Sequence, residues 1–161
     1  MERGDRGWMI LSAEEFDRVQ AQAEAEYPAE CCGVVLVRSG PPVERVLLPC
    51  RNIQDELHAK DPVRHPRDAR TAYFIDPKDL LAIGRREAQG YRVAVIYHSH
   101  IDAGAYFSET DKRNALMNGE PAYPEAVYVV VSVVERRLAE AGAFVWDPDA
   151  HDFVVTELRM A

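Results

Sequence analysis

Two histidines and an aspartate are the residues of this chain whose types and spacing best suit catalytic chemistry. His98 and His100 follow the apolar run 93–97, which predicts a strand. Side chains two apart on a strand leave the same face, so both imidazoles should point toward one place. Asp111 supplies a carboxylate from beyond the next loop. Two imidazoles and one carboxylate suit a zinc ion whose fourth position stays open, the arrangement of a catalytic site.

Each half of this pattern also has a plainer interpretation. The histidines could be polar residues at a strand end, and Ser108 with Asp111 three residues later resembles a helix capping box. The two halves together favour a site, because a helix beginning at Ser108 would bring Asp111 back toward the end of the strand. The serine hydroxyl and the carboxylate would then lie side by side.

The spacing of His98, His100, Ser108 and Asp111 resembles the JAMM motif of the MPN-domain metallo-isopeptidases, in the stand-alone prokaryotic form. The stretch 28–33, Pro-Ala-Glu-Cys-Cys-Gly, is similar to the family's Pro-x-Glu-x-Cys-Gly segment and nominates Glu30. The resemblance extends from the first predicted helix to the last strands. One departure is Ile101, where the family often has proline, which affects substrate preference more than metal binding.

This resemblance implies a zinc site made by His98, His100 and Asp111. It gives Glu30 the role of general base and then general acid, and Ser108 that of hydrogen-bond donor to an oxyanion. Spacing alone would leave Glu30 a solvated carboxylate before a strand. The bonds cut in this family are amides, often isopeptides, at the C-terminal tails of ubiquitin-like proteins. Stand-alone prokaryotic members are associated with ubiquitin-like sulfur-carrier proteins, so such a tail is the expected substrate and partner.

The loop 101–107 is the expected place for substrate contacts. Gly104 would let backbone approach a substrate tail and accept positive φ, and Tyr106 and Phe107 would offer apolar surface beside the metal. The alternative is that both aromatic rings pack beneath the loop and hold it. The sequence does not choose between these interpretations.

The predicted order mixes helices and strands, with hairpins at both ends. A capping box at Ser12 opens a helix to about Glu26, and Asp76-Pro77 opens another that ends near Gly90. A third helix runs from Ser108 to about Met117, and the stretch 49–71 reads as a long functional or mobile loop. The predicted strands are 33–37, 43–48, 73–75, the strand carrying His98, 127–134, 139–146 and 153–158. This order favours a single α+β domain over residues 1–161, with a mixed sheet flanked by helices, and the resemblance implies the MPN fold, which is like that of cytidine deaminase.

Composition narrows the class of protein. Of the 161 residues, 47% are hydrophobic and 29% charged, as in globular proteins. A net charge of −8 argues against non-specific nucleic-acid binding. No apolar run is long enough to span a membrane, and residues 1–7 lack the apolar core of a signal peptide. Three cysteines, two of them adjacent, favour buried thiols and a cytoplasmic location.

Two other functions stay open at this point. One is a catalytically silent MPN scaffold that binds partners, although silent members usually lack a metal ligand and all appear in this sequence. The other is a zinc hydrolase of small amides unrelated to ubiquitin-like proteins. A homodimer is also left open.

Overall fold

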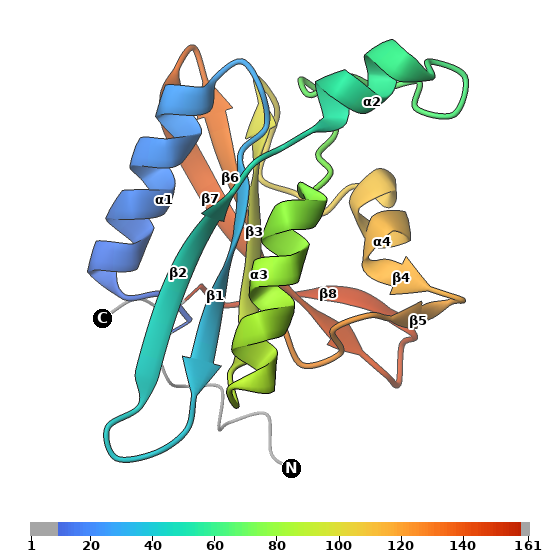
Figure 1. Cartoon of the computed structure of the whole chain (residues 1–161). Helices are drawn as coiled ribbons and strands as arrows, with labels where there is room; N and C mark the ends of the chain where they lie inside the picture. Colours follow the sequence, from blue (N-terminus) through green and yellow to red (C-terminus); the bar gives the residue numbers. More distant parts are fainter. Residues whose placement is uncertain (1–9, 159–161) are drawn as a thin grey trace.

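A six-stranded mixed sheet in the order β2-β1-β3-β6-β7-β8 forms the centre of the molecule (Figure 1). The computed structural model describes residues 10–158, so the charged segment 1–7 lies outside the described residues. The strands are β1 (Cys32–Arg38), β2 (Glu44–Cys50), β3 (Arg92–Ile101), β6 (Val127–Val134), β7 (Arg137–Asp147) and β8 (Asp152–Thr156). Only β3 and β6 pair in parallel, and the other neighbours in this sheet are antiparallel. The α+β class with a mixed sheet is therefore confirmed.

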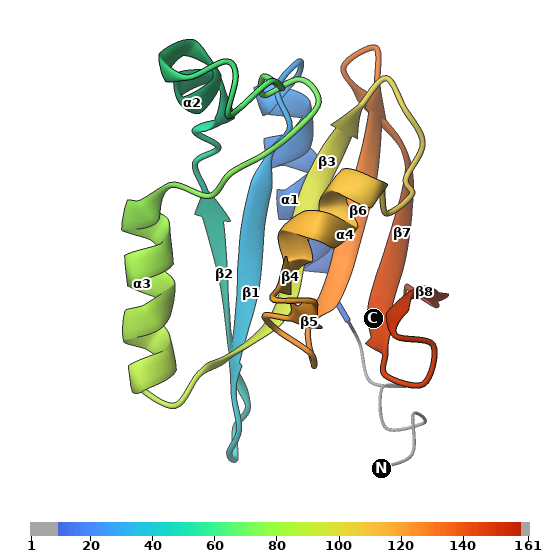
Figure 2. The same ribbon diagram turned by 90° about the vertical axis from the view of Figure 1, so that its right-hand side faces the viewer.

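Helices cover both faces of this sheet. Helix α1 (Ala13–Glu26) lies on one face, and α3 (Pro77–Ala88) and α4 (Glu109–Ala115) lie on the other (Figures 1 and 2). The predicted capping box is present at α1, where the Ser12 hydroxyl accepts from the Glu15 backbone and the Glu15 carboxylate accepts from the Ser12 backbone. Asp76 caps α3, with proline at the first helical position. Local sequence therefore sets where these helices begin.

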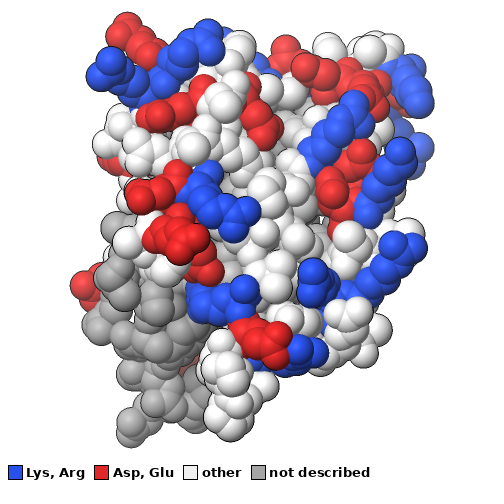
Figure 3. Space-filling view, turned by 60° about the vertical axis from the view of Figure 1, so that its left-hand side comes forward, with Lys and Arg blue, Asp and Glu red and all other residues white. Residues whose placement is uncertain are grey.

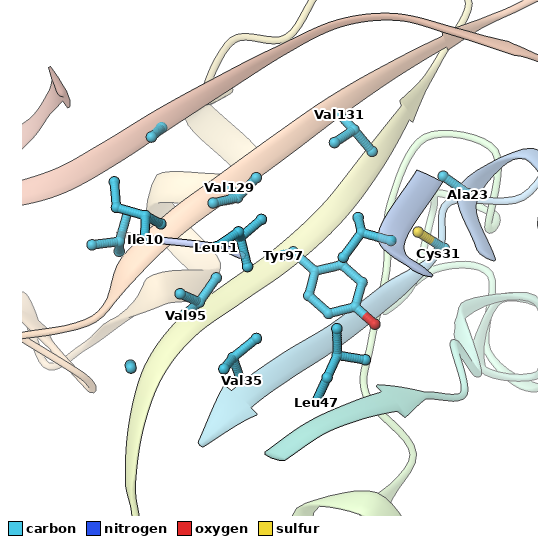
Figure 4. Close-up of a cluster of buried hydrophobic side chains, with 14 of the residues drawn as sticks. Ile10, Leu11, Ala23, Cys31, Val35, Leu47, Val95, Tyr97, Val129 and Val131 are labelled. Carbon is cyan, nitrogen blue, oxygen red and sulfur yellow. The ribbon is translucent and has the colours of Figure 1, made fainter. Parts of the chain in front are cut away.

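The sheet is buried on both sides at its centre, as the apolar runs of β1, β3 and β6 require. Toward α1, a core of aliphatic side chains surrounds Tyr97 (Figure 4). The Tyr97 hydroxyl is satisfied by donating to Gln22 Oε1 of α1 at 2.5 Å. On the opposite face, Ile83 of α3 and Ala115 of α4 close a second core. His98 and His100 belong to this second face because they alternate with Tyr97.

The stretch 49–71 is more ordered than its sequence predicted. β2 continues to Cys50, and α2 (Gln54–Lys60) forms inside the predicted loop. Acidic residues in its first turn and basic residues in its last favour this helix through its dipole. Seven residues are too few to show helical periodicity, so the prediction of an irregular loop was wrong here. The predicted strand 73–75 is also wrong, since only an isolated bridge joins Ile75 to Asn52.

The third predicted helix ends two residues early. α4 stops at Ala115, and β4 (Leu116–Met117) and β5 (Glu120–Pro121) form a short hairpin. Its two-residue turn is Asn118-Gly119, with φ of 54° and 80°. Positive φ at both positions is typical of a type I′ turn, for which Asn-Gly is the strongest sequence signal. That signal is present in the sequence and was missed.

Acidic and basic side chains are intermingled on the face of the molecule that Figure 3 shows, without a large patch of either sign. Within residues 10–158, no helix is long and apolar enough to cross a membrane.

Candidate metal centre

His98, His100 and Asp111 converge on one buried point at the end of β3. Their side-chain ligand atoms all lie within 4.8 Å of one another. The Nε2 atoms of both histidines lie 3.1 Å from Asp111 Oδ2. Ligands bound tetrahedrally at the usual zinc distances of about 2.0–2.2 Å sit roughly 3.3–3.6 Å apart. The spacing of these three atoms therefore fits one small cation at their centre.

His98 is fully buried, and its ring nitrogens lack hydrogen-bond partners of acceptable geometry among the described residues. It lies between Cys32 of β1 and Val130 of β6, so the strand holds it rigidly. The ring of Tyr73 stacks on it with centroids 4.6 Å apart. Burial lowers the pKa of His98, which favours the neutral imidazole that metals bind. A buried ring nitrogen without a partner is costly unless a ligand occupies it.

His100 is oriented by the backbone of the following loop. Its Nδ1 lies 2.9 Å from the carbonyl oxygen of Gly104, which can only accept, so Nδ1 carries the proton. In a neutral ring, Nε2 then directs a lone pair at Asp111 Oδ2. Two facing lone pairs require positive charge between them, either a metal ion or a second ring proton. The carbonyl that fixes the ring tautomer is a typical outer contact of a metal-bound histidine.

Asp111 is placed by the start of α4. The Ser108 hydroxyl accepts from the Asp111 backbone N–H, and Asp111 Oδ2 accepts from the Ser108 backbone N–H, both at 3.0 Å. The predicted capping box and the predicted side-by-side arrangement are therefore both present. Burial alone would raise the pKa of Asp111, but the contacts with His100 and His98 hold it well below its usual range. The carboxylate is ionised, as a metal ligand must be.

Glu30 lies just before β1 and is only 4% exposed, with its Oε1 unpaired among the described residues. Burial is the largest cause that raises its pKa to about 9, and the charge of Asp111 adds to the effect. Its backbone N–H donates to the Ala69 carbonyl at 2.7 Å, and its carbonyl accepts from Asn52 Nδ2 at 2.9 Å. The backbone N–H of the next residue, Cys31, donates to Ser99 Oγ at 2.7 Å, which ties this segment to the strand of the histidines.

A cleft of about 290 Å³ joins these groups. Glu30, His100, Ser108 and Asp111 line it together with Tyr106. Tyr106 is 54% exposed and packs edge-on against His100, with ring centroids 4.9 Å apart. The loop therefore presents an exposed aromatic ring beside the His–His–Asp group.

Gly104 and Phe107 do not line this cleft. Phe107 is buried against Tyr128, Phe144 and Phe153, which is the packing role weighed against substrate contact. Gly104 does not have positive φ; Asp102 of this loop does, at 53°. A Cβ on Gly104 would lie 3.1 Å from Glu140 Oε1, so a side chain at this position would point toward β7.

Asn52, Ser99 and Tyr73 are the site residues that the sequence did not identify as such. Asn52 makes four hydrogen bonds that join Glu30 to the segment before α3. Asn52 and Tyr73 carried no local pattern, because their contacts with Glu30, the segment 72–74 and His98 span 20 or more residues of sequence. Ser99 alone had a signal, its place between the two histidines.

Other candidate ligands stay outside this group. Cys31, Cys32 and Cys50 are buried free thiols, and burial raises the pKa of Cys31 and Cys50 to about 12. His58 and His65 contact each other, with Nδ1 of His58 2.8 Å from the His65 carbonyl. Among residues 10–158, only His98, His100 and Asp111 form a metal-capable group.

A buried His–His–Asp group at a strand end, in a cleft that a buried glutamate also lines, defines an α+β domain able to bind a metal ion. Residues 12–158 match the family described as prokaryotic homologs of the JAB domain. The chain therefore belongs to this family, and the expected relation to stand-alone prokaryotic JAMM/MPN proteins is confirmed.

Related proteins agree with this placement. The CysO-cysteine peptidase of Mycobacterium tuberculosis is 31% identical over 125 residues, 77% of this chain and 73% of that protein. The tail tip assembly protein K of Escherichia phage N15 is 42% identical over 97 residues, 60% of this chain. The chain spans only 32% of that phage protein.

Solved structures share the fold. A protein from Desulfitobacterium hafniense superposes with a TM-score of 0.64 at 20% identity, covering 94% of this chain and 91% of that one. A protein from Salinibacter ruber gives 0.60 at 23% identity, covering 94% and 90%. The family and the peptidase relative together support a peptidase-like function, and the His–His–Asp group is able to bind a metal.

Proposed function

We propose that the protein is a zinc-dependent peptidase that hydrolyses an amide at the C-terminal tail of a ubiquitin-like sulfur-carrier protein. The observation that carries the proposal is the convergence of His98, His100 and Asp111 beside the buried Glu30. The substrate class is supported by the relative named CysO-cysteine peptidase and by the resemblance of the motif to enzymes of ubiquitin-like tails.

The described residues fit a zinc ion because their donor set and spacing suit it and because His98 is otherwise unsatisfied. His98, His100 and Asp111 would hold the ion. When bound, zinc supplies Lewis acidity, which polarises a carbonyl and lets water ionise near neutral pH.

Glu30 would move the proton. It takes a proton from the attacking water and gives it to the leaving amine, while the water oxygen bonds to the carbonyl carbon and the C–N bond breaks. Burial favours the protonated carboxyl in the metal-free protein, and a nearby divalent cation favours the ionised form that a base requires.

Ser108 would stabilise the oxyanion that forms at the carbonyl. Its Oγ accepts from the Asp111 backbone, so the hydroxyl hydrogen is left to donate into the cleft. Such a donor is worth a few kcal/mol at the transition state. Tyr106, exposed beside His100, is the proposed contact for the substrate tail.

The test is hydrolysis of a ubiquitin-like sulfur-carrier protein extended by one residue beyond its Gly-Gly end, followed by mass spectrometry. We expect cleavage that chelation abolishes and zinc restores. Glu30→Gln should keep about one zinc per chain and lose activity about 10²–10⁴-fold. His98→Ala/His100→Ala should lose both zinc and activity.

The matched control is His58→Ala/His65→Ala, which removes two histidines outside the metal-ligand group. It should keep zinc and activity. Full zinc occupancy in the His98/His100 variant would refute the ligand assignment. A zinc-loaded protein that leaves every tailed substrate intact would refute the peptidase and favour the silent scaffold.

A further inference from the structure

Three arginines line the metal cleft of a chain whose net charge is −8. Arg67 and Arg70 come from the segment between α2 and α3, and Arg113 comes from α4. Arg70 is neutralised by an ion pair with Asp102 at 2.9 Å. Within residues 10–158, the guanidinium groups of Arg67 and Arg113 make no hydrogen bond or ion pair. The cleft therefore has two exposed cations without a partner in the described chain.

Arg67 and Glu30 are held in place by one connected set of hydrogen bonds. Its backbone carbonyl accepts from the buried Gln54 side chain at 2.9 Å. Two residues on, the Ala69 N–H donates to Asp55 Oδ1 at 2.7 Å, and the Ala69 carbonyl accepts from the Glu30 N–H at 2.7 Å. Helix α2, which supplies Gln54 and Asp55, thus holds Arg67 at the Glu30 side of the cleft.

Arg67 and Glu30 line the same cleft, and no hydrogen bond or ion pair joins them within residues 10–158. The pKa of Glu30 is raised mainly by burial and by Asp111, and the Arg67 charge opposes this rise. The cleft of about 290 Å³ that Arg67 and Glu30 line is open to a small anionic group. Arg113, one turn after Glu109 on α4, lines the same cleft.

We propose that Arg67 and Arg113 bind the α-carboxylate of a single C-terminal residue that leaves from the scissile amide. This inference rests on the proposed function, in which Glu30 protonates the leaving nitrogen. The carboxylate carbon of an α-linked residue is only two bonds from that nitrogen, so it falls beside Glu30. The planar guanidinium fork matches a carboxylate and binds it with charge-assisted hydrogen bonds.

The two arginines have no comparable group to bind on the leaving side of an isopeptide substrate. There the leaving nitrogen is a lysine Nζ, followed by four methylene groups that carry no charge. Two unpaired arginines beside the leaving group therefore favour removal of a free C-terminal residue over cleavage of a side-chain conjugate. The structure thus assigns Arg67 and Arg113 to substrate specificity.

The kinetic test compares three peptides that share a Gly-Gly tail. One ends in an alanine with a free carboxylate, the second in the corresponding alanine amide, and the third is linked to a lysine Nζ. We expect the zinc-loaded protein to cleave the free acid about 10- to 100-fold better, in kcat/KM, than the other two. Arg67→Gln and Arg113→Gln should lower cleavage of the acid, mainly through KM, by a clearly larger factor than they lower cleavage of the amide.

The matched control is Arg18→Gln, which removes an exposed charge from α1 on the opposite face of the sheet. It should leave all three rates as in the wild type. Equal rates for acid and amide, or equal losses on both peptides in the arginine variants, would overturn the carboxylate assignment while leaving the peptidase standing.

A binding measurement keeps the inference testable if no peptide is cleaved. Calorimetry on the metal-free Glu30→Gln variant should show tighter binding of the acid than of the amide. Because no metal is present, coordination of the carboxylate by zinc cannot cause this preference. Loss of the preference when Arg67→Gln is added supports the inference. The absence of any preference before that change refutes it, whatever the fate of the proposed activity.

Discussion

Replacing Glu30 with glutamine should stabilise the metal-free protein, and increasingly so as pH rises. Glu30 is 4% exposed, and its pKa is raised from 4.5 to about 9. Below pH 4.5 the carboxyl is protonated whether the chain is folded or unfolded, so it contributes no pH dependence. Between pH 4.5 and 9 the folded chain keeps the proton and the unfolded chain releases it. Unfolding therefore becomes easier as pH rises through this range.

The size of the effect follows from the pKa. At pH 7 the solution is 2.5 pH units above the pKa of 4.5 that the carboxyl has in the unfolded chain, and each unit is worth about 1.36 kcal/mol. Release of the proton in the unfolded chain therefore lowers the free energy of unfolding by at most about 3.4 kcal/mol. Glutamine has nearly the same shape and no charge to lose. The difference in unfolding free energy between Glu30→Gln and the wild type should therefore grow by about 1 kcal/mol per pH unit from pH 5 to 8.

The assay is urea unfolding of chelator-treated protein at several pH values. Glu14→Gln, which removes an exposed carboxylate of α1, is the control and should run parallel to the wild type. With zinc present, the gain in unfolding free energy from Glu30→Gln should be smaller, because a divalent cation stabilises the carboxylate of the wild type. If the unfolding free energies of metal-free Glu30→Gln and wild type change with pH in parallel, the reasoning is refuted. That result would mean that Glu30 ionises as easily in the folded chain as in the unfolded one.

Two further substitutions test the support of the site. Gly104→Val should weaken zinc binding about tenfold, as outer contacts of metal ligands typically do. The new Cβ would press on Glu140 at 3.1 Å and disturb the carbonyl that orients His100; zinc titration checks this, and a raised KM with unchanged zinc affinity would instead place Gly104 in the substrate groove. Asn52→Ala should lower the unfolding free energy by about 2–4 kcal/mol, because it leaves four hydrogen-bonding groups without their partner. It should also reduce kcat while zinc stays bound. An unchanged kcat would mean that Asn52 is not needed to position Glu30.

The grouping of His98, His100 and Asp111 was predictable because its geometry is local. Strand alternation is enough to place His98 and His100 on one face, and a capping box is enough to place Asp111 beside Ser108. The sequence therefore predicted three side chains that the structure brings within 4.8 Å of one another. Glu30 needed the family resemblance, because its position depends on pairing between segments almost 70 residues apart, through Cys31 and Ser99.

The elements that were predicted wrongly are short. Seven residues of α2 and two of each strand in the β4–β5 hairpin give too little periodicity to distinguish from a loop. Their stability comes from tertiary contacts, as when the Gln54 and Asp55 side chains bind the backbone of 67–69. Phe107 shows the same limit, because hydrophobicity could not say whether its ring faces substrate or core.

The stretch 49–71 illustrates how such weakly patterned sequence can organise a site. Its prolines and polar residues suggested a long loop, yet Asn52, Gln54 and Asp55 bind backbone groups that converge on Glu30. Each of these side chains replaces a backbone partner that regular structure would have supplied. Residues 61–71 are therefore irregular and yet held by side-chain hydrogen bonds, which suits the proposed base Glu30, since a base must meet its substrate within hydrogen-bond distance. The same segment carries Arg67 to the cleft, so the support of the proposed base and the proposed recognition of the leaving group depend on the same hydrogen bonds.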